Sequence, residues 1–234
     1  AETYHQMRLQ LLVESKDFAL ARREIDDMER KKKLDMAFIA GFRAEVERRA
    51  GNYKEAEQIL IDALCHIPPG VLCAGLHAQL ARIYIHYIPS KRTLHRAEKL
   101  IDEAVDFVTE EPHHLLLQAV RGELYMVREK YSKAEKLLKE SIDRLLEDHP
   151  IPPTANPPFV MRIWFNLKGI MSQLFYSQQD ENQNPFYAEV CLSLAKVYIA
   201  LEQKEKATQT LHSGLALCQQ PFIADQLREL LRSV

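Results

Sequence analysis

The sequence predicts an all-α protein in which antiparallel helix pairs follow one another along the chain, an α-solenoid. Three observations predict this class. The chain has 234 residues, 47% of them hydrophobic, so it can bury a sizeable apolar core. Only 7 residues are glycine, about 3% against a usual ~7%, which disfavours glycine-rich phosphate loops and β-hairpins. A short phrase of residues also recurs at intervals typical of paired helices.

The recurring phrase is a polar turn, an aromatic residue, two polar residues and an Ala-Glu pair at the start of an amphipathic segment. It is clearest at 51–57 and 129–135, and variants lie at 16–22, 94–98 and 203–207. Each copy has an alanine at the corresponding place, and these are Ala21, Ala56, Ala97, Ala134 and Ala207. The steps between them are 35, 41, 37 and 73 residues. Because the last step is about twice the others, we expect six units, of which the fifth has lost its signature.

Residues at fixed offsets within the units identify the kind of repeat. The second unit carries Ala44, Gly51, Tyr53, Ala56, Leu60, Ala63 and Pro68. The fourth unit repeats the pattern with Gly122, Tyr125, Tyr131, Ala134, Leu138 and Ser141, and the last with Ala195, Tyr198, Ala207, Leu211 and Gly214. Small residues let two crossing helices approach closely, and the aromatic and leucine side chains fill the space beside them. The chain thus resembles the tetratricopeptide repeat (TPR) family, which implies a right-handed superhelix of helix pairs A and B.

Repeats one to four are expected within residues 1–148. In the third repeat, residues 88–92 lengthen the turn between the two helices, because Pro89 ends a helix. A proline-rich crossing is expected at 149–158, which holds five of the 11 prolines of the chain. That composition is incompatible with a helix and predicts an extended, polyproline-like segment.

Residues 159–234 are expected to hold the irregular fifth unit, the last repeat and a C-terminal capping helix, all within one continuous solenoid. A helical pattern covers 159–176, and a polar loop follows it. One helix therefore stands where two are expected. Either a repeat has lost its second helix, or the A and B roles shift by one after residue 158. The amphipathic tail from Pro221 suits a cap, and the alternative is the first helix of a further repeat.

Charge and composition exclude several classes of function. Lys and Arg number 31 against 33 Asp and Glu, so no global field favours nucleic acid, and direct contact with it is disfavoured. No apolar run reaches the ~18 residues of a membrane span. The start of the chain has no secretory signal pattern, which favours a cytoplasmic location, and it lacks an initiator Met, which suggests an excised domain or a processed form. The four cysteines show no C-x-x-C spacing, which predicts buried, reduced thiols.

The compact motifs of hydrolases, zinc proteases, dinucleotide-binding proteins and P-loop enzymes are absent, so neither an enzyme nor a cofactor is expected. A scattered site of Glu123, His86 and Arg82 is the one form that an enzyme could take. Cys73 and His77 share a helix face with spacing that fits half a metal site, with His86 further along, but ordinary packing is the preferred interpretation. The basic run at 30–33 is interpreted as capping the end of a helix.

The TPR resemblance places a set of side chains on or near the concave face of the superhelix, where the family binds an extended peptide or a partner helix. These residues are Phe38, Glu45, Arg48, Arg49, Arg82, His86, Glu123, Met126 and Lys196, with Gln6, Gln10 and Glu189 beside them. Gln6 and Gln10 stand where the family's carboxylate clamp has Lys and Asn, which disfavours binding of a chaperone tail. The three arginines could pair with acidic side chains of a partner, and a solvated, charge-balanced face is the alternative.

Two functions follow from the repeats and from the lack of catalytic motifs. The first is a non-enzymatic scaffold or adaptor that binds a partner protein or peptide in the concave groove. The alternative is a sensor or regulatory domain of a larger protein that binds a small molecule, peptide or protein. Residues 51–70 are similar to helical-repeat arrays of LuxR-class regulators. A net charge near zero also permits self-association.

Overall fold

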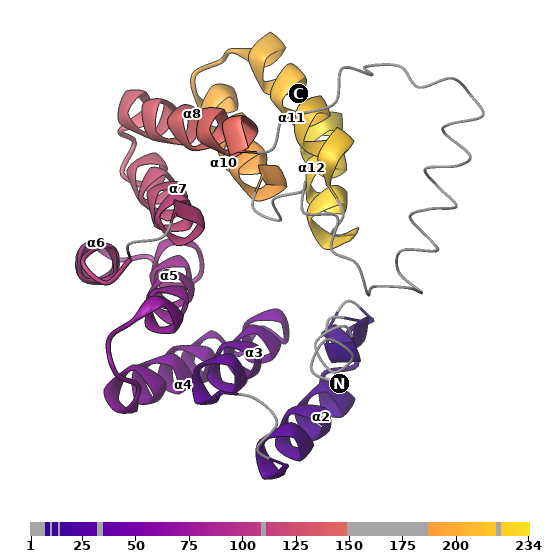
Figure 1. Ribbon diagram of the computed structural model, residues 1–234. Coiled ribbons are helices and arrows are strands. Elements are labelled where there is room, and N and C mark those ends of the chain that lie inside the picture. The colour runs from indigo at the N-terminus through magenta and orange to yellow at the C-terminus, as the bar shows by residue number, and fades with distance from the viewer. Residues whose placement is uncertain are drawn as a thin grey trace.

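The helices of the computed structural model form a curved row that leaves one side open (Figure 1). The structure describes residues 8–9, 11–13, 15–31, 35–108, 111–148, 187–218 and 221–234. The helices in these ranges are α2 (Phe18–Arg30), α3 (Met36–Arg49), α4 (Tyr53–His66), α5 (Val71–His86), α6 (Lys91–Val105), α7 (Glu111–Val127), α8 (Tyr131–Asp148), α10 (Tyr187–Ala200), α11 (Lys204–Leu217) and α12 (Pro221–Ser233). Residues 8–9 and 11–13 are also helical.

Consecutive helices pack as antiparallel pairs, namely α3 with α4, α5 with α6, α7 with α8, and α10 with α11. The first helix of each pair also packs on both helices of the pair before it: α5 contacts α3 and α4, and α7 contacts α5 and α6. In Figure 1, α5 lies on the inner side of the curve and α6 on the outer side. This arrangement confirms the predicted all-α fold of TPR-like helix pairs.

The recurring alanines are fully buried between the helices. Ala21, Ala56, Ala97, Ala134 and Ala207 are each 0% exposed. Glycines serve the same purpose at two crossings. A Cβ atom on Gly122 would lie 2.8 Å from Cγ of Leu138, and one on Gly214 would lie 2.9 Å from Cβ of Cys191. The small residues of the repeat pattern are therefore required by the distance between helices, as ridge-and-groove packing predicts.

The turns inside four of the units share one geometry. Lys16, Gly51, Glu129 and Glu202 have φ between 58° and 85°, in the left-handed region. In each turn the next residue donates its N–H to the carbonyl five residues earlier, at 2.8 to 2.9 Å, for example Asn52 to Glu47 and Gln203 to Tyr198. This is the Schellman ending of an α-helix. Glycine occupies the left-handed position in one of these turns, and charged residues occupy it in the other three.

Replacing Glu129 or Glu202 with glycine is expected to raise the free energy of unfolding by up to about 1 kcal/mol each. An L side chain in the left-handed region is strained by about 1–2 kcal/mol, and the greater freedom of glycine in the unfolded chain offsets part of the gain. Urea unfolding of each variant against the wild type measures the effect. Gly51→Ala is the reverse control and should lower stability. An unchanged midpoint in both glycine variants contradicts the strain argument.

The third unit departs from this turn, as predicted from Pro89. Helix α5 ends at His86 and α6 begins at Lys91. The Ser90 hydroxyl accepts a hydrogen bond from the Thr93 N–H at 3.1 Å, and the Thr93 hydroxyl accepts one from the Ser90 N–H at 2.8 Å. These two bonds form a capping box. The longer turn thus has its own start signal for the second helix.

The last repeat stacks directly on the fourth. Helix α10 packs against both α8 and α7, in the same way that α7 packs against α6 and α5. Among the described helices, α10 therefore takes the helix A position next to α8. The pair that the sequence numbers as sixth thus follows the fourth in the stack. The crossing expected at 149–158 and the helix expected at 159–176 lie outside the described residues.

Helix α12 covers the end of the row. It packs on α11 and α10 and buries Ile223, Ala224 and Leu227 there. This contact is the one expected of a capping helix, and helix A of a further repeat would pack in the same way. Within the ranges that the structure describes, no helix is both long enough and apolar enough to cross a bilayer.

The cysteines follow the burial of the helices that carry them. All four are thiols outside any disulfide, with Cys73 and Cys191 buried and Cys218 half-buried. Burial raises the pKa of the Cys191 thiol to about 12, which makes it an inert structural thiol. The expectation of buried thiols is wrong for Cys65, which is exposed. Helix α4 buries the face of Ala56 and Leu60, and Cys65 lies off that face.

Candidate functional site

Five side chains from α5, α7 and α10 form one polar network on the inner side of the curve. We call this group the Arg82 network: Arg82, His86, Glu123, Glu189 and Ser193. Arg82 donates from Nη2 to Oε1 of Glu123 at 3.0 Å, from Nε to Oε2 of Glu123 at 3.3 Å and from Nη1 to Oε2 of Glu189 at 2.8 Å. One arginine therefore joins the first helices of three pairs that are consecutive in the stack.

Glu123 lies at the centre of this network and is only 4% exposed. His86 Nε2 lies 2.9 Å from its Oε2 atom, and the Ser193 hydroxyl donates to its Oε1 atom at 3.2 Å. Because a carboxylate only accepts, the His86 nitrogen is the donor in this pair. Each oxygen of Glu123 thus accepts two hydrogen bonds, one of them from Arg82.

The network determines the charge of Glu123. Burial alone would raise the pKa of this carboxyl, but the Arg82 charge and the hydrogen bonds from His86 and Arg82 outweigh burial and hold the pKa well below its usual range. The two glutamates likewise raise the pKa of Arg82, against the opposing effect of burial. Glu123 is therefore a carboxylate throughout the physiological pH range, and a buried charge of this kind is stable only while its partners stay in place.

Acidification is expected to destabilise the fold through Glu123. Its pKa is lower in the folded than in the unfolded chain, so its contribution is complete above the unfolded value of about 4.3 and is lost as the pH falls below that value. Glu123→Gln should be less stable at pH 7 and should lose less stability than the wild type between pH 7 and pH 3. Urea unfolding at pH 7, 4.5 and 3 tests this. Equal losses in the two proteins contradict the assignment.

A second cluster lies on α3 and reaches the end of α5. We call it the Glu45 cluster: Glu45, Arg48, Arg49 and Tyr87. Arg48 donates to the two Glu45 oxygens at 2.7 and 2.6 Å, and Arg49 Nε donates to Oε1 at 2.7 Å. Arg48 also donates to the Tyr87 hydroxyl. Burial would raise the pKa of Glu45, but the bonds and charges of Arg48 and Arg49 lower it overall. Two arginines are thus held beside one carboxylate.

The Glu45 cluster touches the far end of the chain. The guanidinium carbon of Arg49 lies 3.4 Å from the ring centroid of Phe222, near the start of α12. Tyr87 in turn stacks on Tyr53, with ring centroids 4.5 Å apart and an interplanar angle of 21°. The cluster therefore contacts the second repeat, the third repeat and the C-terminal helix.

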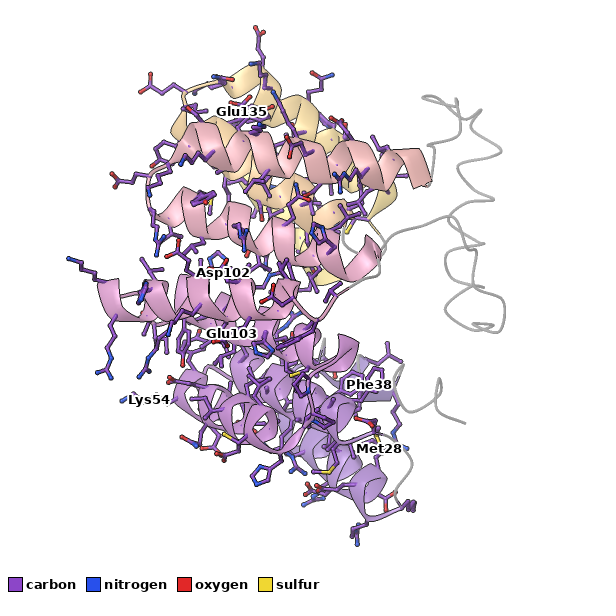
Figure 2. All side chains as sticks on the ribbon, turned by 60° about the vertical axis from the view of Figure 1, so that its left-hand side comes forward. Met28, Phe38, Lys54, Asp102, Glu103 and Glu135 are labelled. Carbon is purple, nitrogen blue, oxygen red and sulfur yellow. The ribbon has the colours of Figure 1, made fainter. Side chains whose placement is uncertain are left out.

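The other residues expected on the concave face differ in exposure. Phe38 is 42% exposed and is labelled in Figure 2, where it lies on the opposite side of the array from Lys54. Lys196 is exposed, whereas Met126 is partly buried against the core. Gln6 and Gln10 lie outside the described residues.

Sequence reasoning missed two members of these clusters, Ser193 and Tyr87, and the contact of Phe222 with Arg49. Ser193 had a signal, because it lies one turn from Glu189 on the mostly apolar helix α10. Tyr87 and Phe222 had none, because their contacts depend on how far the row of helices curves. The set of Arg82, His86 and Glu123 is brought together, as a scattered enzyme site requires. The oxygens of Glu123 are already occupied, however, which leaves no free acceptor for a substrate proton.

The candidate metal half-site is part of the packing between α5 and α6. Cys73 Sγ lies 3.6 Å from His77 Nδ1, and that nitrogen lies 2.8 Å from the Cys73 carbonyl oxygen. His77 Nε2 lies 3.9 Å from Glu103. His86 belongs to the Arg82 network and not to this pair. Among the described residues, no group of three or more His, Cys, Asp or Glu side chains could hold a metal ion. These contacts agree with the packing interpretation.

The basic run at the end of α2 is paired within its own helix. Arg30 and Lys31 both form ion pairs with Asp27, and the Lys31 N–H donates to the Asp27 carbonyl. These contacts agree with the capping interpretation for the two residues. Lys32 and Lys33 lie outside the described residues.

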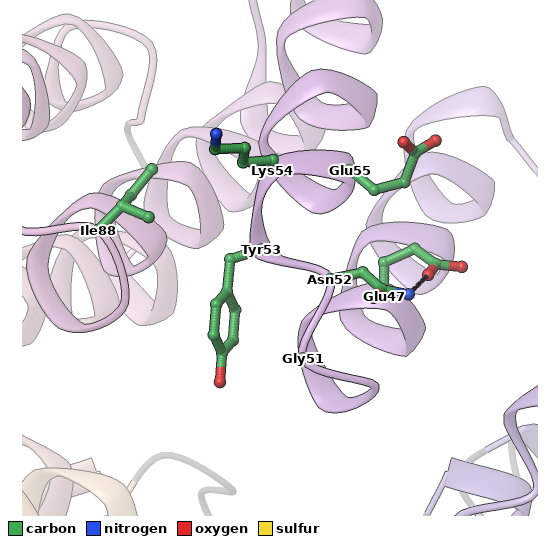
Figure 3. Close-up of a pocket in the computed structure, with 7 residues that line it drawn as sticks. All are labelled: Glu47, Gly51, Asn52, Tyr53, Lys54, Glu55 and Ile88. Carbon is green, nitrogen blue, oxygen red and sulfur yellow. Dashed lines mark hydrogen bonds between the residues drawn. The ribbon is translucent and has the colours of Figure 1, made fainter.

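Two open hollows lie in the part of the chain that the structure describes, and the first borders Tyr53, on which Tyr87 of the Glu45 cluster stacks. The first, of about 780 Å³, lies at the turn of the second repeat between Tyr53 and Ile88 (Figure 3). Asn52 there donates to Glu47 at 2.8 Å and forms no side-chain cap on α4. The second, of about 500 Å³, is lined by Cys73 and His77 with the apolar end of α4. Both are wide open to solvent, unlike the concave, enclosed sites that small ligands occupy.

Comparison with solved structures supports the fold. The chain is similar to a thermophilic TPR protein from Thermus thermophilus, with a TM-score of 0.60 and 15% sequence identity over 99% of this chain and 100% of that one. A TPR protein from Parabacteroides merdae aligns at 14% identity over 99% of this chain and 98% of that one, with a TM-score of 0.26 that adds no argument. No family model and no curated protein matches. The chain has the TPR fold, which confirms at the level of fold the resemblance found in the sequence.

Proposed function

We propose that this chain is a non-enzymatic protein-interaction scaffold that binds a segment of a partner protein on its concave face. The TPR fold is one that typically serves protein partners. The observation that carries the proposal is the exposure of Phe38. It is 42% exposed and, with Leu11 and Met36, is one of the exposed large hydrophobic side chains among the described residues. Its spacing of 7 and 11 residues from Glu45 and Arg49 puts it on their face of α3.

Preorganisation would provide much of the affinity. Glu45, Arg48 and Arg49 hold one another at 2.6 to 2.7 Å before any partner binds, so little side-chain freedom is lost on docking. Aromatic and arginine side chains in such a setting dominate binding energies. We therefore expect Phe38 to insert into the partner and the Glu45 cluster to orient it. Lys196, exposed on α10, is a further candidate contact.

The Arg82 network has a different role in this proposal. The Nε, Nη1 and Nη2 atoms of Arg82 already donate to Glu123 and Glu189. A partner carboxylate would have to break these bonds inside a half-buried site, which costs several kcal/mol for a paired charge. We propose that Arg82, His86 and Glu123 hold the curvature of the binding face and that they contribute to binding through its shape.

The test is a quantitative capture experiment with the chain as bait at physiological salt. The wild type is compared with Phe38→Ala, with Arg49→Glu and with Lys54→Glu, the last a matched control on the opposite side of the array (Figure 2). The expected result is a partner whose affinity falls about tenfold or more in the first two variants and is unchanged in the third. A partner that binds Phe38→Ala as well as the wild type overturns the assignment of this face. Recovery of no partner by the wild type counts against the scaffold itself.

The sensor alternative makes a different prediction. A small-molecule sensor should gain thermal stability when its ligand is present, because binding to the folded state alone shifts the unfolding equilibrium. A thermal-shift screen on the same protein measures this. A stabilising small molecule together with an empty capture experiment would favour the sensor over the scaffold.

A further inference from the structure

Helix α12 reaches across the open side of the array. Its start, where Phe222 lies, faces the half of the molecule that holds α3, as Figure 1 shows at the lower end of α12. The guanidinium carbon of Arg49 lies 3.4 Å from the ring centroid of Phe222. Phe222 also packs against the cluster in which Ile223 and Leu227 of α12 are buried with residues of α10 and α11. The contact between Phe222 and Arg49 thus links the C-terminal helix α12 to the second repeat.

Bonds to neighbours on α3 hold the Arg49 side of this contact in position. Arg49 Nε donates to Glu45 Oε1 at 2.7 Å, and Arg48 holds the same carboxylate with two bonds of 2.6 and 2.7 Å. The bond to Glu45 therefore holds the Arg49 guanidinium at its edge. The flat face of the guanidinium is left for stacking. The Arg49 side chain is 19% exposed with the ring in place. A fixed, weakly hydrated guanidinium is the group that aromatic faces bind best.

We propose that the Arg49 guanidinium is an aromatic-binding subsite of the concave face, occupied within the chain by Phe222, and that a partner enters it with an aromatic side chain of its own. The partner half of this inference rests on the scaffold function proposed above and names the chemistry of its ligand. The chain shows the form that such a ligand takes: an aromatic residue at the start of an amphipathic helix. An aliphatic side chain lacks the negative ring face that the guanidinium attracts.

Occupation by Phe222 also regulates the subsite. Phe222 belongs to the same chain, and its ring lies against Arg49 without any partner present. A partner must displace the ring, and its apparent affinity is reduced by the fraction of molecules in which the subsite is filled. Only the start of α12 has to move, because the buried residues on α10 and α11 keep the helix in place.

Hydrogen exchange of the whole chain tests whether the contact couples the two ends. Arg49→Ala should speed exchange at the start of α12, and Phe222→Ala should speed it at the end of α3, each by about two- to fivefold. Phe222→Leu keeps apolar volume without a ring and should behave like Phe222→Ala, whereas Phe222→Trp should behave like the wild type. Phe38→Ala is the control on α3 and should leave α12 unchanged. No effect of Arg49→Ala on α12 overturns the proposal.

The aromatic preference is tested by NMR of the Arg49 Nε–H group, which the bond to Glu45 protects from exchange. In the wild type the Phe222 ring current should shift this signal, and Phe222→Leu should remove the shift. N-acetylphenylalaninamide, titrated up to its solubility limit, should move the signal of Phe222→Leu toward its wild-type position more than N-acetylleucinamide does, and it should have little effect on the wild type. Equal responses to the two amides overturn the proposal. Neither test uses a partner, so a failed capture experiment and a failed subsite are distinguished.

Discussion

Replacing Arg82 with alanine is expected to lower the free energy of unfolding by about 3 kcal/mol or more, the cost of leaving a buried charge unpaired. Glu123 is 4% exposed and receives two of its four hydrogen bonds from Arg82. The variant also loses the bond to Glu189, and with it the link between α5 and α10. Urea unfolding with linear extrapolation measures the loss.

Arg43→Ala is the matched control for this prediction. Arg43 bonds to Asp26 and Glu29 at 2.7 and 3.0 Å, but these carboxylates are 61% and 54% exposed. Exposed pairs of this kind contribute about 1 kcal/mol or less. The double variant Arg82→Ala with Glu123→Gln should be more stable than Arg82→Ala alone, because it removes the unpaired charge. If Arg82→Ala and Arg43→Ala cost the same, the Arg82 network does not hold the helices together.

Replacing Leu138 with alanine is expected to lower the free energy of unfolding by about 2–5 kcal/mol, the range for large-to-small changes in a core. Leu138 is 0% exposed and lies against Gly122 at the crossing of α7 and α8. Gly122→Ala should also destabilise, because its new Cβ would lie 2.8 Å from Leu138 Cγ. The double variant should lose less than the two single losses combined, since the new methyl group enters the cavity.

Leu137→Ala is the control for Leu138, because it makes the same change one residue earlier on a half-buried side chain. It should cost clearly less than Leu138→Ala. Thermal or urea unfolding of the wild type, Gly122→Ala, Leu138→Ala and the double variant gives the coupling between Gly122 and Leu138. Strictly additive losses would contradict the close approach of α7 and α8 at this crossing.

The repeat fold was predictable because its signals are local. The alanines at 21, 56, 97, 134 and 207 recur at the repeat spacing, and each proves to be 0% exposed. The long turn of the third unit was predicted from Pro89, and α5 and α6 end and begin beside it. In a repeat array each unit contacts mainly its neighbours, so residues within about 40 positions of each other determine the packing.

The candidate site was only partly predictable. The TPR resemblance placed Glu45, Arg48 and Arg49 on one helix and Arg82 with His86 on another. It did not identify their partners. Arg82 bonds to Glu189, a residue 107 positions away, and Arg49 stacks on Phe222. Both contacts depend on the curvature of the whole row, to which every helix crossing contributes a small rotation.

The array of helix pairs and the small residues at their crossings could be predicted from the amino-acid pattern alone. Both are local features, because each repeat contacts mainly its neighbours. The stacking of the pair α10 and α11 on α7 and α8 became visible in the folded structure. The folded structure alone also showed that the charged residues of the inner face satisfy one another and that α12 meets α3. These contacts join helices that are far apart along the chain. Their relative position depends on the rotation that each unit adds, and this total rotation cannot be read from the residues of any single unit.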